Sequence, residues 1–395
     1  MITDNFGIYI HIPACLKKCG YCDFNTYQLS DKKISGVLLD NYVKALCHEI
    51  VQAPNRLINL VKTGENRSTQ TVNSFVKWKF NYGKISTIFL GGGTPTLLSV
   101  KHLKQIFQAI CNSFTIDKSA EITMEANPDT VDYDYLEQIY SLGVNRLSIG
   151  VQSFNTDILR VLDRTHNPAN VLSAVNWANQ IGFNISLDLI YGVPKMSLDI
   201  WQKTLKTALQ LPIKHISCYA LTLSDTVPLA KSIDSGQYKA LDEKLVAKFY
   251  LLADKLLARA GWEWYEISNW SKGKKYRSQH NLAYWQGGQW LGFGAGAASS
   301  LANFRLVNPN LPSDYIKGKP AKMEKLNSEQ LIIEKIMLQT RTRYGLKMVD
   351  LDFNFAKLAN LLKLDLIDKS ELELGIIVPT IKGRLLHNQL IQAFL

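Results

Sequence analysis

The segment CLKKCGYC, residues 15–22, holds three of the chain's six cysteines, at Cys15, Cys19 and Cys22. Cubane iron–sulfur clusters bind thiolate ligands, and short spacings on a loop let several sulfur atoms converge on one cluster. Three cysteines leave one iron of a [4Fe-4S] cluster without a protein ligand. That iron is free to bind the amino and carboxylate groups of S-adenosylmethionine (SAM), which the protein would hold and orient. The segment therefore predicts a [4Fe-4S] cluster that works with SAM.

A zinc site is the alternative for the same segment, because His11 and the three cysteines would complete a tetrahedral set of nitrogen and sulfur ligands. Zinc sites more often pair one Cys-x2-Cys knuckle with a second, distant one. The remaining cysteines are isolated in apolar patterns that are typical of buried, inert thiols; they are Cys47, Cys111 and Cys218. The spacing and the strand-then-loop context therefore favour the cluster.

Six short apolar segments alternate with helical patterns over the first two thirds of the chain and predict β-strands. Amphipathic segments such as residues 134–140 and 171–178 predict helices between them. This alternation is typical of parallel β-α units, in a complete or partial barrel or in an open doubly wound sheet. The chemically distinctive residues lie at or just beyond the ends of successive strands, which favours a partial (β/α)6 barrel with its site at that rim. The expected strands are residues 7–12, 86–90, 121–125, 146–150, 184–190 and 215–221.

The chain divides into three expected parts. Residues 1–230 form the α/β barrel core with the cluster and SAM site, residues 231–312 a flanking region rich in Trp, Tyr and Gly, and residues 313–395 a small α-rich C-terminal domain. The polar segment 53–84 is longer than a crossover needs, so it predicts a surface insertion. Elements expected in the C-terminal part are helices at residues 334–338, at residues 355–362 and from Lys382, with an extended piece at residues 378–380.

Composition restricts the class of protein. The 395 residues are 46% hydrophobic and 20% charged, as in ordinary soluble globular proteins. No uninterrupted apolar run reaches the roughly 20 residues of a membrane-spanning helix. The first residues lack the basic stretch and apolar core of a secretory signal, so we expect a cytoplasmic protein. The formal net charge is +11, but the basic residues are spread along the chain, and we expect no nucleic-acid partner.

A resemblance to a known family begins at residues 9–15 (YIHIPAC) and continues through Cys19 and residues 21–24 (YCDF). These segments resemble the radical SAM superfamily, and in particular the branch of oxygen-independent coproporphyrinogen III oxidase (HemN) and its relative HemW, a family of heme chaperones. The resemblance covers nearly the whole chain and implies a set of SAM-binding residues. They are Tyr9, Tyr21, Gly92, Gly93, Thr94, Glu125, Gln152, Arg164, Asp188 and Ala220.

The residue types in this set suit SAM. Glycines after a strand let the backbone approach a ligand closely. The carboxylates of Glu125 and Asp188 can accept hydrogen bonds from ammonium or ribose hydroxyl groups, and Gln152 offers both a donor and an acceptor. Arg164 can hold a carboxylate in bidentate fashion. Each residue alone is better explained by a surface or capping role, so the interpretation depends on the ordered set.

Two departures from the HemN pattern favour the HemW-like branch. HemN has a further cysteine two residues after its third cluster cysteine, where this chain has Phe24. HemN also has an N-terminal extension before the first strand, whereas the first strand here starts at about Gly7. Both departures put coproporphyrinogen decarboxylation by this chain in doubt.

The segment HNLAYW, residues 280–285, matches a His-Asn-x-x-Tyr-Trp motif of HemW proteins that the resemblance links to heme. It implies that His280 is an axial ligand of heme iron, with Tyr284 and Trp285 against the porphyrin face. A structural corner, in which His280 satisfies loop backbone groups, is the alternative. A basic loop precedes the motif and is a candidate to hold the heme propionates; its residues are Lys272, Lys274, Lys275 and Arg277.

The resemblance implies a heme chaperone that binds heme and transfers it to an acceptor protein, with a [4Fe-4S] cluster and exchangeable SAM as cofactors. A membrane-associated respiratory protein is one candidate acceptor. The alternative is an oxygen-independent coproporphyrinogen III oxidase or dehydrogenase of porphyrin biosynthesis. A tRNA-modifying radical SAM enzyme is a third hypothesis, but the chain lacks the dense aromatic and basic stripes of a single-strand binder. The sequence assigns no catalytic residue.

Overall fold

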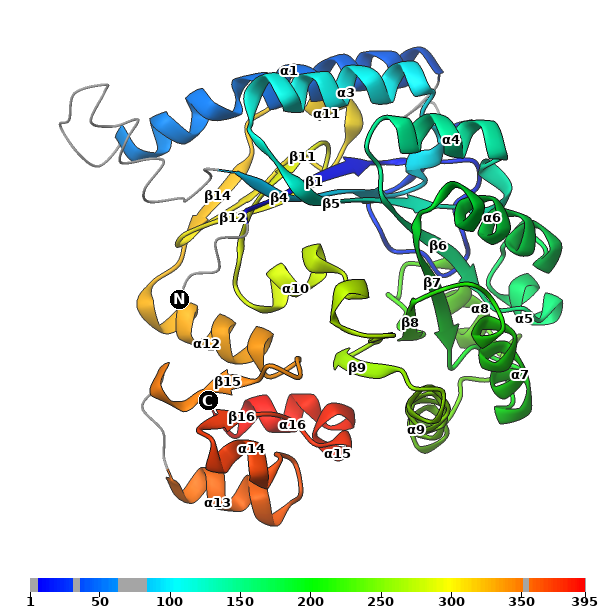
Figure 1. Ribbon diagram of the computed structural model, residues 1–395, viewed down its shortest axis with the longest axis vertical. Coiled ribbons are helices and arrows are strands. Elements are labelled where there is room, and N and C mark those ends of the chain that lie inside the picture. The colour runs from blue at the N-terminus through cyan, green and yellow to red at the C-terminus, as the bar shows by residue number, and fades with distance from the viewer. Residues whose placement is uncertain (1–5, 31–35, 63–83, 351–354, 395) are drawn as a thin grey trace.

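The computed structural model describes residues 6–30, 36–62, 84–350 and 355–394 (Figure 1). Within the segment expected to be an insertion, residues 53–62 continue helix α1 (Gly36–Lys62) instead of starting a loop. The rest of that segment, residues 63–83, lies outside the described residues.

The six strands expected from the sequence are confirmed, and they form a continuous parallel sheet. Neighbouring strands follow the order β1-β4-β5-β6-β7-β8, and each pairing between them is parallel. The sheet bends strongly along this order, from β1 and β5 to β7 and β8 (Figure 1). The strand bounds are β1 (Phe6–Ile12), β4 (Ile85–Gly92), β5 (Ile116–Ala126), β6 (Arg146–Gln152), β7 (Asn184–Tyr191) and β8 (His215–Ala220).

The connecting helices cover the outer side of the sheet (Figure 1). Helix α3 illustrates how the sequence forms them. The Ser99 side chain accepts a hydrogen bond from the backbone N–H of His102 and caps the helix. Leu103, Ile106 and Ile110 repeat at helical spacing and are fully buried, which stabilises the fold by roughly 1.5–3 kcal/mol for each side chain. The outer helices are α1, α3 (Val100–Ser113), α4 (Tyr133–Ser141), α6 (Pro168–Ile181), α7 (Leu198–Leu209) and α9 (Glu243–Arg259).

The sheet extends beyond the six expected strands on both edges. Strand β11 (Gln289–Phe293) pairs in parallel with β1, although it follows β1 by more than 270 residues, and three antiparallel strands continue this edge. Gly292 of β11 is required by close packing, because a Cβ there would lie 2.0 Å from the carbonyl oxygen of Ala298. The order of the described strands has two ends, so the barrel is partial. The added strands are β12 (Ala298–Leu301), β13 (Phe304–Val307) and β14 (Lys322–Lys325) on this edge, with β10 (Asn269–Ser271) and β9 (Glu263–Glu266) on the other.

Helix α10 (Gln279–Trp285) differs from the other helices because it lies on the inner side of the curved sheet, against β1 and β4 (Figure 1). Ser278 caps it by accepting a hydrogen bond from the backbone N–H of Asn281. The motif that the sequence links to heme therefore belongs to a helix that fills the base of the barrel.

A second hydrophobic core lies in the C-terminal part of the chain and centres on Leu346, Leu361, Ile377 and Leu390, which are all fully buried. The expected helices are present, but the last one is divided into α15 and α16. The expected extended piece, residues 378–380, lies just after the short strand β16, and within it Pro379 forms an isolated bridge with Ile367. The division of the chain at residues 230 and 312 stays a prediction. The elements around this core are α12 (Ser328–Gln339), β15 (Leu346–Lys347), α13 (Phe355–Lys363), α14 (Lys369–Glu373), β16 (Ile376–Ile377), α15 (Ile381–Leu385) and α16 (His387–Gln392).

No helix among the described residues combines the length and the apolar character needed to span a membrane.

Candidate functional site

The cysteine segment forms a loop at the end of β1. Its start and its return are joined by two backbone hydrogen bonds, from Tyr27 N–H to the Pro13 carbonyl (2.7 Å) and from Leu29 N–H to the Cys15 carbonyl (2.9 Å). Gly93 N–H donates to the Ile12 carbonyl (2.8 Å) and so ties the loop to the glycine segment after β4. These bonds place the loop over the rim of the barrel at which β4 to β8 also end.

Cys15, Cys19 and Cys22 all line one cavity of about 460 Å³ at this rim. The Thr94 hydroxyl lies 3.8 Å from the Cys15 sulfur, and a guanidinium nitrogen of Arg164 lies 3.6 Å from the Cys19 sulfur. Burial raises the pKa of the Cys15 thiol to about 11. Iron would reverse this effect, because a thiol that coordinates a metal is deprotonated outright.

The arrangement of donors fits a cluster better than a single ion. No group of three or more Cys, His, Asp or Glu side chains in the described segments is close enough to hold one metal ion. A cubane cluster needs no such group, because each of its thiolates binds a different iron. His11, the fourth ligand of the zinc alternative, is buried with Nδ1 2.9 Å from the Tyr9 hydroxyl and Nε2 2.9 Å from the Asn25 carbonyl oxygen. Its ring nitrogens are therefore both engaged within the protein.

The same cavity gathers nine of the ten residues expected to bind SAM. Ala220 contributes from the end of β8, and Gln152 from the end of β6, where its backbone adopts a positive φ of 62°. Tyr9 is the exception: it lines a second, inner chamber instead. The nine are Tyr21, Gly92, Gly93, Thr94, Glu125, Gln152, Arg164, Asp188 and Ala220.

Arg164 is already engaged by the protein. Its Nη2 donates to the Gly150 carbonyl at 2.6 Å and to the Asn127 side chain, and its Nη1 points at the Cys19 sulfur. The guanidinium therefore joins the ends of β5 and β6 to the cysteine loop. This role differs from the free bidentate clamp that the sequence suggested.

Two carboxyl groups lie at the floor of the cavity. Glu125 Oε2 accepts a hydrogen bond from Gly92 N–H at 2.9 Å, and Asp188 Oδ2 accepts one from the Ser148 hydroxyl at 2.7 Å. Burial, followed by repulsion from Asp188, raises the pKa of Glu125 to about 7. Burial also raises the pKa of Asp188. Glu125 is thus poised to exchange protons or accept hydrogen bonds near neutral pH.

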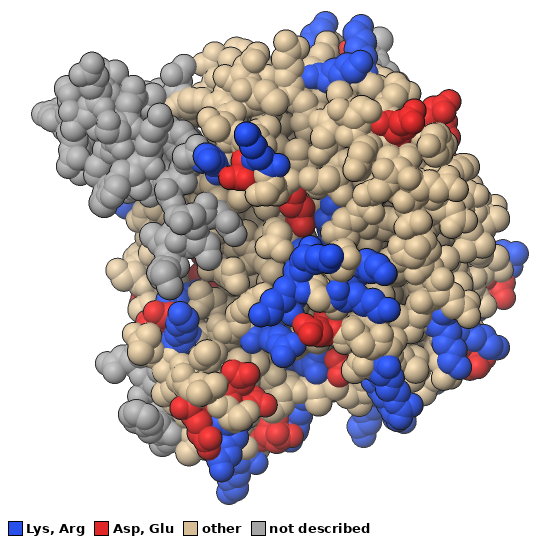
Figure 2. All heavy atoms as spheres, in the orientation of Figure 1, with Lys and Arg blue, Asp and Glu red and all other residues tan. Residues whose placement is uncertain are grey.

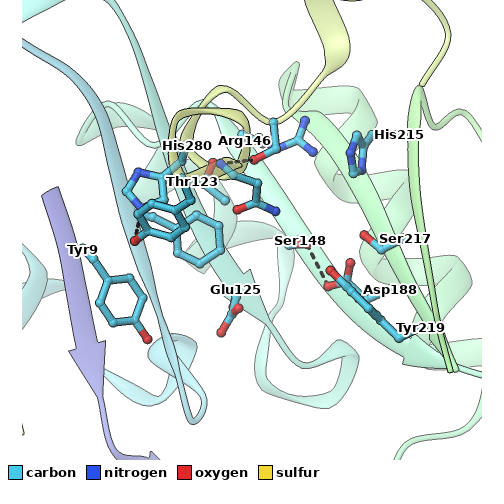
Figure 3. A pocket seen from close by; sticks show the side chains of 14 residues that line it. Tyr9, Thr123, Glu125, Arg146, Ser148, Asp188, His215, Ser217, Tyr219 and His280 are labelled. Carbon is cyan, nitrogen blue, oxygen red and sulfur yellow. Dashed lines mark hydrogen bonds between the residues drawn. The ribbon is translucent and has the colours of Figure 1, made fainter. Parts of the chain in front are cut away.

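A chamber of about 220 Å³ lies deeper in the barrel, and Figure 3 shows its lining. Glu125, Ser148, Asp188 and Tyr219 line both the chamber and the rim cavity, so the two spaces adjoin. The sequence did not single out most of the polar residues around the chamber. Their signal is the alternation of polar side chains along single strands, with Arg146 and Ser148 on β6 and His215, Ser217 and Tyr219 on β8.

His280 lines this chamber and is 1% exposed. Its Nδ1 lies 2.8 Å from the Thr87 hydroxyl and its Nε2 lies 2.7 Å from the Tyr284 hydroxyl, while the ring stacks on Phe89. Burial lowers the pKa of the imidazole to about 3, so it is neutral. In this geometry a heme iron could reach His280 only after one of these hydrogen bonds broke. The contacts of His280 are those of a structural residue, as in the alternative given by the sequence. Its partners are side-chain hydroxyl groups, however, and not the loop backbone groups that were expected.

The other two residues of the heme prediction lie apart from each other. Tyr284 lines the inner chamber, whereas Trp285 lines neither this chamber nor the rim cavity and has the guanidinium of Arg341 over its ring at 5.2 Å. The rings of Tyr284 and Trp285 therefore do not form one face for a porphyrin in this geometry.

The basic loop before α10 is only partly available for ligands. Arg277 is 1% exposed, pairs with Glu263 at 2.7 Å and donates to the Tyr344 hydroxyl at 2.7 Å. The prediction that Arg277 binds a heme propionate is therefore wrong. Figure 2 shows Lys and Arg side chains gathered on the face that carries α10 and β9. The three exposed members of the loop are Lys272, Lys274 and Lys275.

Comparison with known proteins identifies the family. The profile of the radical SAM superfamily matches residues 9–208. The heme chaperone HemW of Bacillus subtilis is 33% identical over 404 residues, which cover 98% of each chain. HemW of Mycobacterium tuberculosis is 35% identical over 88% of this chain and 84% of its own. HemW of Escherichia coli is 35% identical over 79% of this chain and 76% of its own.

The fold has a solved counterpart. Coproporphyrinogen III oxidase (HemN) from Escherichia coli superimposes with a TM-score of 0.79 over 99% of this chain and 90% of that chain, at 23% identity. At this identity the likeness shows the fold, while the more similar HemW sequences show the branch. The chain belongs to the radical SAM superfamily and, within it, to the HemW family.

Proposed function

We propose that the protein is a heme chaperone, which binds heme and transfers it to an acceptor protein. The observation that carries this proposal is the similarity to heme chaperones along nearly the whole chain. Phe24 supports it locally: it occupies the position of an additional HemN cysteine, is 62% exposed and lines the rim cavity. A phenyl ring there cannot supply the acid–base or redox chemistry of a thiol.

We also propose that Cys15, Cys19 and Cys22 hold the [4Fe-4S] cluster and that the rim cavity holds SAM. The cluster supplies an electron and one open iron site when it is bound. Glu125 and Asp188 would accept hydrogen bonds from the ammonium and hydroxyl groups of SAM, because their carboxyl oxygens lie in the cavity at the ends of β5 and β7. The Arg164 guanidinium would hold the cysteine loop at a fixed distance from these carboxyl groups.

The variant Glu125→Gln tests two effects of this carboxyl group separately: its role in SAM binding and the stability that the fold loses when the group ionises. The Glu125 pKa of about 7 lies above the ordinary value of 4.5, so ionisation destabilises the fold as the pH rises through this interval. We expect the free energy of unfolding of the variant to exceed that of the wild type by on the order of 2 kcal/mol at pH 8 and to equal it near pH 4, where the carboxyl group is protonated. The difference at pH 8 stays below the full effect of the pKa shift because the cavity keeps part of the carboxylate hydrated. Urea unfolding without SAM at both pH values measures this difference.

The same variant should lose SAM affinity, because an amide cannot carry the charge that attracts the SAM ammonium. Isothermal titration with SAM measures the loss on the reconstituted protein. Glu137→Gln, at an exposed residue in the middle of the outer helix α4, is the matched control and should change neither quantity. Equal SAM binding by Glu125→Gln and the wild type would contradict the assignment of Glu125.

Coproporphyrinogen III distinguishes the chaperone from an oxidase, the second candidate that the HemN-like fold supports. We expect the reconstituted protein, given SAM, reductant and coproporphyrinogen III without oxygen, to form no vinyl product, whereas HemN assayed in parallel does. We expect the same preparation to bind hemin with a shift of its Soret band. Vinyl product would refute the chaperone-only proposal, and an unchanged hemin spectrum would refute heme binding.

Heme ligation by His280 stays a prediction, and it requires the Thr87 or the Tyr284 hydrogen bond to open. The hemin spectrum of the His280→Ala variant tests it. A lost Soret shift in a folded variant would support His280 as a ligand, and an unchanged spectrum would exclude it.

A further inference from the structure

Trp285, the last residue of α10, is held by two groups from other parts of the chain. Its indole N–H donates a hydrogen bond to the Glu266 carboxyl group. The guanidinium of Arg341 lies over its ring, 5.2 Å from the centroid. Since Trp285 lines neither the rim cavity nor the inner chamber, these two contacts set the orientation of its ring.

The Glu266 carboxyl group is fixed at the end of β9. The residue is 1% exposed, and its carboxyl oxygens accept hydrogen bonds from the Ser268 N–H at 3.3 Å and from the Asn269 side-chain amide. Burial raises its pKa to about 8, so the group is mostly neutral at pH 7 and still accepts hydrogen bonds. The indole of Trp285 is therefore bound to a group that the β9–β10 edge of the sheet holds in place.

Arg341 comes from the segment that follows α12 in the C-terminal part of the chain. This segment is joined to β9 by an isolated antiparallel bridge between Glu266 and Thr342, and by a 3.0 Å hydrogen bond from Arg343 N–H to the Tyr265 carbonyl. Helix α12 also contacts α10 directly. In Figure 1, α10 accordingly lies between the barrel strands and the elements of the C-terminal part.

The two ends of α10 are fixed by different parts of the fold. At its start, the Glu121 carboxylate accepts hydrogen bonds from the first two backbone N–H groups of the helix, each at 3.1 Å. At its end, Trp285 binds the two groups described above. A helix of seven residues is too short to be stable by itself, so its geometry depends on such contacts. They therefore determine where the helix places His280 and Tyr284.

We propose that Glu266 and Arg341 are positioning residues for heme binding, which act through Trp285 by anchoring α10 to the C-terminal part of the chain. This inference rests on the proposed heme chaperone function and on heme ligation by His280. A loosened anchor lowers the fraction of molecules in which α10 is placed to bind heme, and the apparent affinity falls with that fraction. The C-terminal part thereby takes part in heme binding, because it supplies the guanidinium over the indole ring.

A second cluster of the same chemistry provides a matched control. Asp254 on α9 accepts hydrogen bonds from the Trp270 indole N–H at 3.1 Å and from the guanidinium of Arg384, in the C-terminal part, at 2.9 Å. These bonds join α9 to β10 and α15, and none that Asp254 makes within the described segments reaches α10. Removing this carboxyl group should weaken the contact between the barrel and the C-terminal part while leaving α10 in place.

Hemin titration of the full chain with its reconstituted cluster tests the proposal. Glu266→Ala, and Trp285→Phe, which removes the indole N–H but keeps an aromatic ring, should each bind hemin about tenfold more weakly than the wild type, as lost outer partners of a metal ligand do. The double variant should also lose about tenfold and not a hundredfold, because both residues act through one hydrogen bond. Arg341→Met should lose roughly two- to fivefold, the value of one cation–π contact.

Two further variants are expected to bind hemin as the wild type does. Glu266→Gln keeps an oxygen that accepts the indole N–H and resembles the neutral carboxyl group. Asp254→Ala removes the control carboxyl group. Urea unfolding should show a comparable loss of stability in Asp254→Ala and Glu266→Ala, so that a difference in hemin affinity reports on α10.

The outcomes separate the two proposals. A wild-type protein that binds no hemin refutes both. If the wild type binds hemin, an unchanged affinity in Glu266→Ala, or an equal loss in Asp254→Ala, refutes the anchor and leaves the chaperone function. Additive losses in the double variant would show that Glu266 does not act through Trp285. If Glu266→Ala fails to fold, wild-type affinity in Trp285→Phe overturns the anchor by itself.

Discussion

The Cys19→Ser variant is expected to fold and to retain about one tenth or less of the wild-type iron and sulfide after anaerobic reconstitution. Iron prefers soft thiolate sulfur, and a serine hydroxyl replaces it poorly. Only Cys15 and Cys22 would then remain, too few for a stable cubane. Loss of a direct ligand should cost at least the 10–100-fold that lost outer partners of metal sites cost.

Cys19 is the informative choice because it is half-buried on the loop, whereas Cys15 is buried and its replacement could disturb folding. Cys111→Ser is the control, since this cysteine, which the sequence predicted to be buried, is exposed on the outer helix α3. Iron and sulfide analysis, the visible spectrum and circular dichroism measure the result. SAM binding should disappear together with the cluster. A full cluster in Cys19→Ser, or a matching loss in Cys111→Ser, would contradict the assignment.

The variant Glu263→Gln should destabilise the fold by about 2–3 kcal/mol, because it leaves the buried Arg277 guanidinium without a counter-ion. The Arg277 side chain is 2% exposed, and its nearest carboxylate is that of Glu263 at 2.7 Å. Its ring contacts, Tyr265 and Tyr344, supply no formal charge. Removing one partner of a buried pair typically costs 3–5 kcal/mol. The cost should lie below this range because Glu263 is itself 47% exposed.

An exposed ion pair provides the comparison. Asp157 and Arg160 lie 2.5 Å apart on α5 (Thr156–Val161), with side chains 71% and 77% exposed. Asp157→Asn should change the stability by less than about 0.5 kcal/mol, since water replaces the pair. Urea unfolding midpoints measure both variants, and the double variant Glu263→Gln with Arg277→Met should recover part of the loss. Equal effects of the two single variants would show that the burial of Arg277 does not matter.

Local patterns in the sequence determined the strands and helices of the barrel and the position of the cluster loop. Five of the six central strands were predicted within two residues, and the third, β5, begins five residues earlier than expected. The apolar segments and the helical spacing between them report local backbone preferences. The cysteine spacing likewise indicated the cluster loop, since its ligands are neighbours in the chain. Nine of ten expected SAM residues line one cavity because parallel strands that end at one rim bring their last residues together.

Only the tertiary structure decided the surroundings of the other polar residues. Thr87 and His280 are 193 residues apart, and their hydrogen bond exists only because α10 enters the barrel beside β4. Arg277 is buried for the same kind of reason, although it stands among lysines that are exposed. Burial depends on contacts between distant segments, and a residue's type and spacing do not encode those contacts.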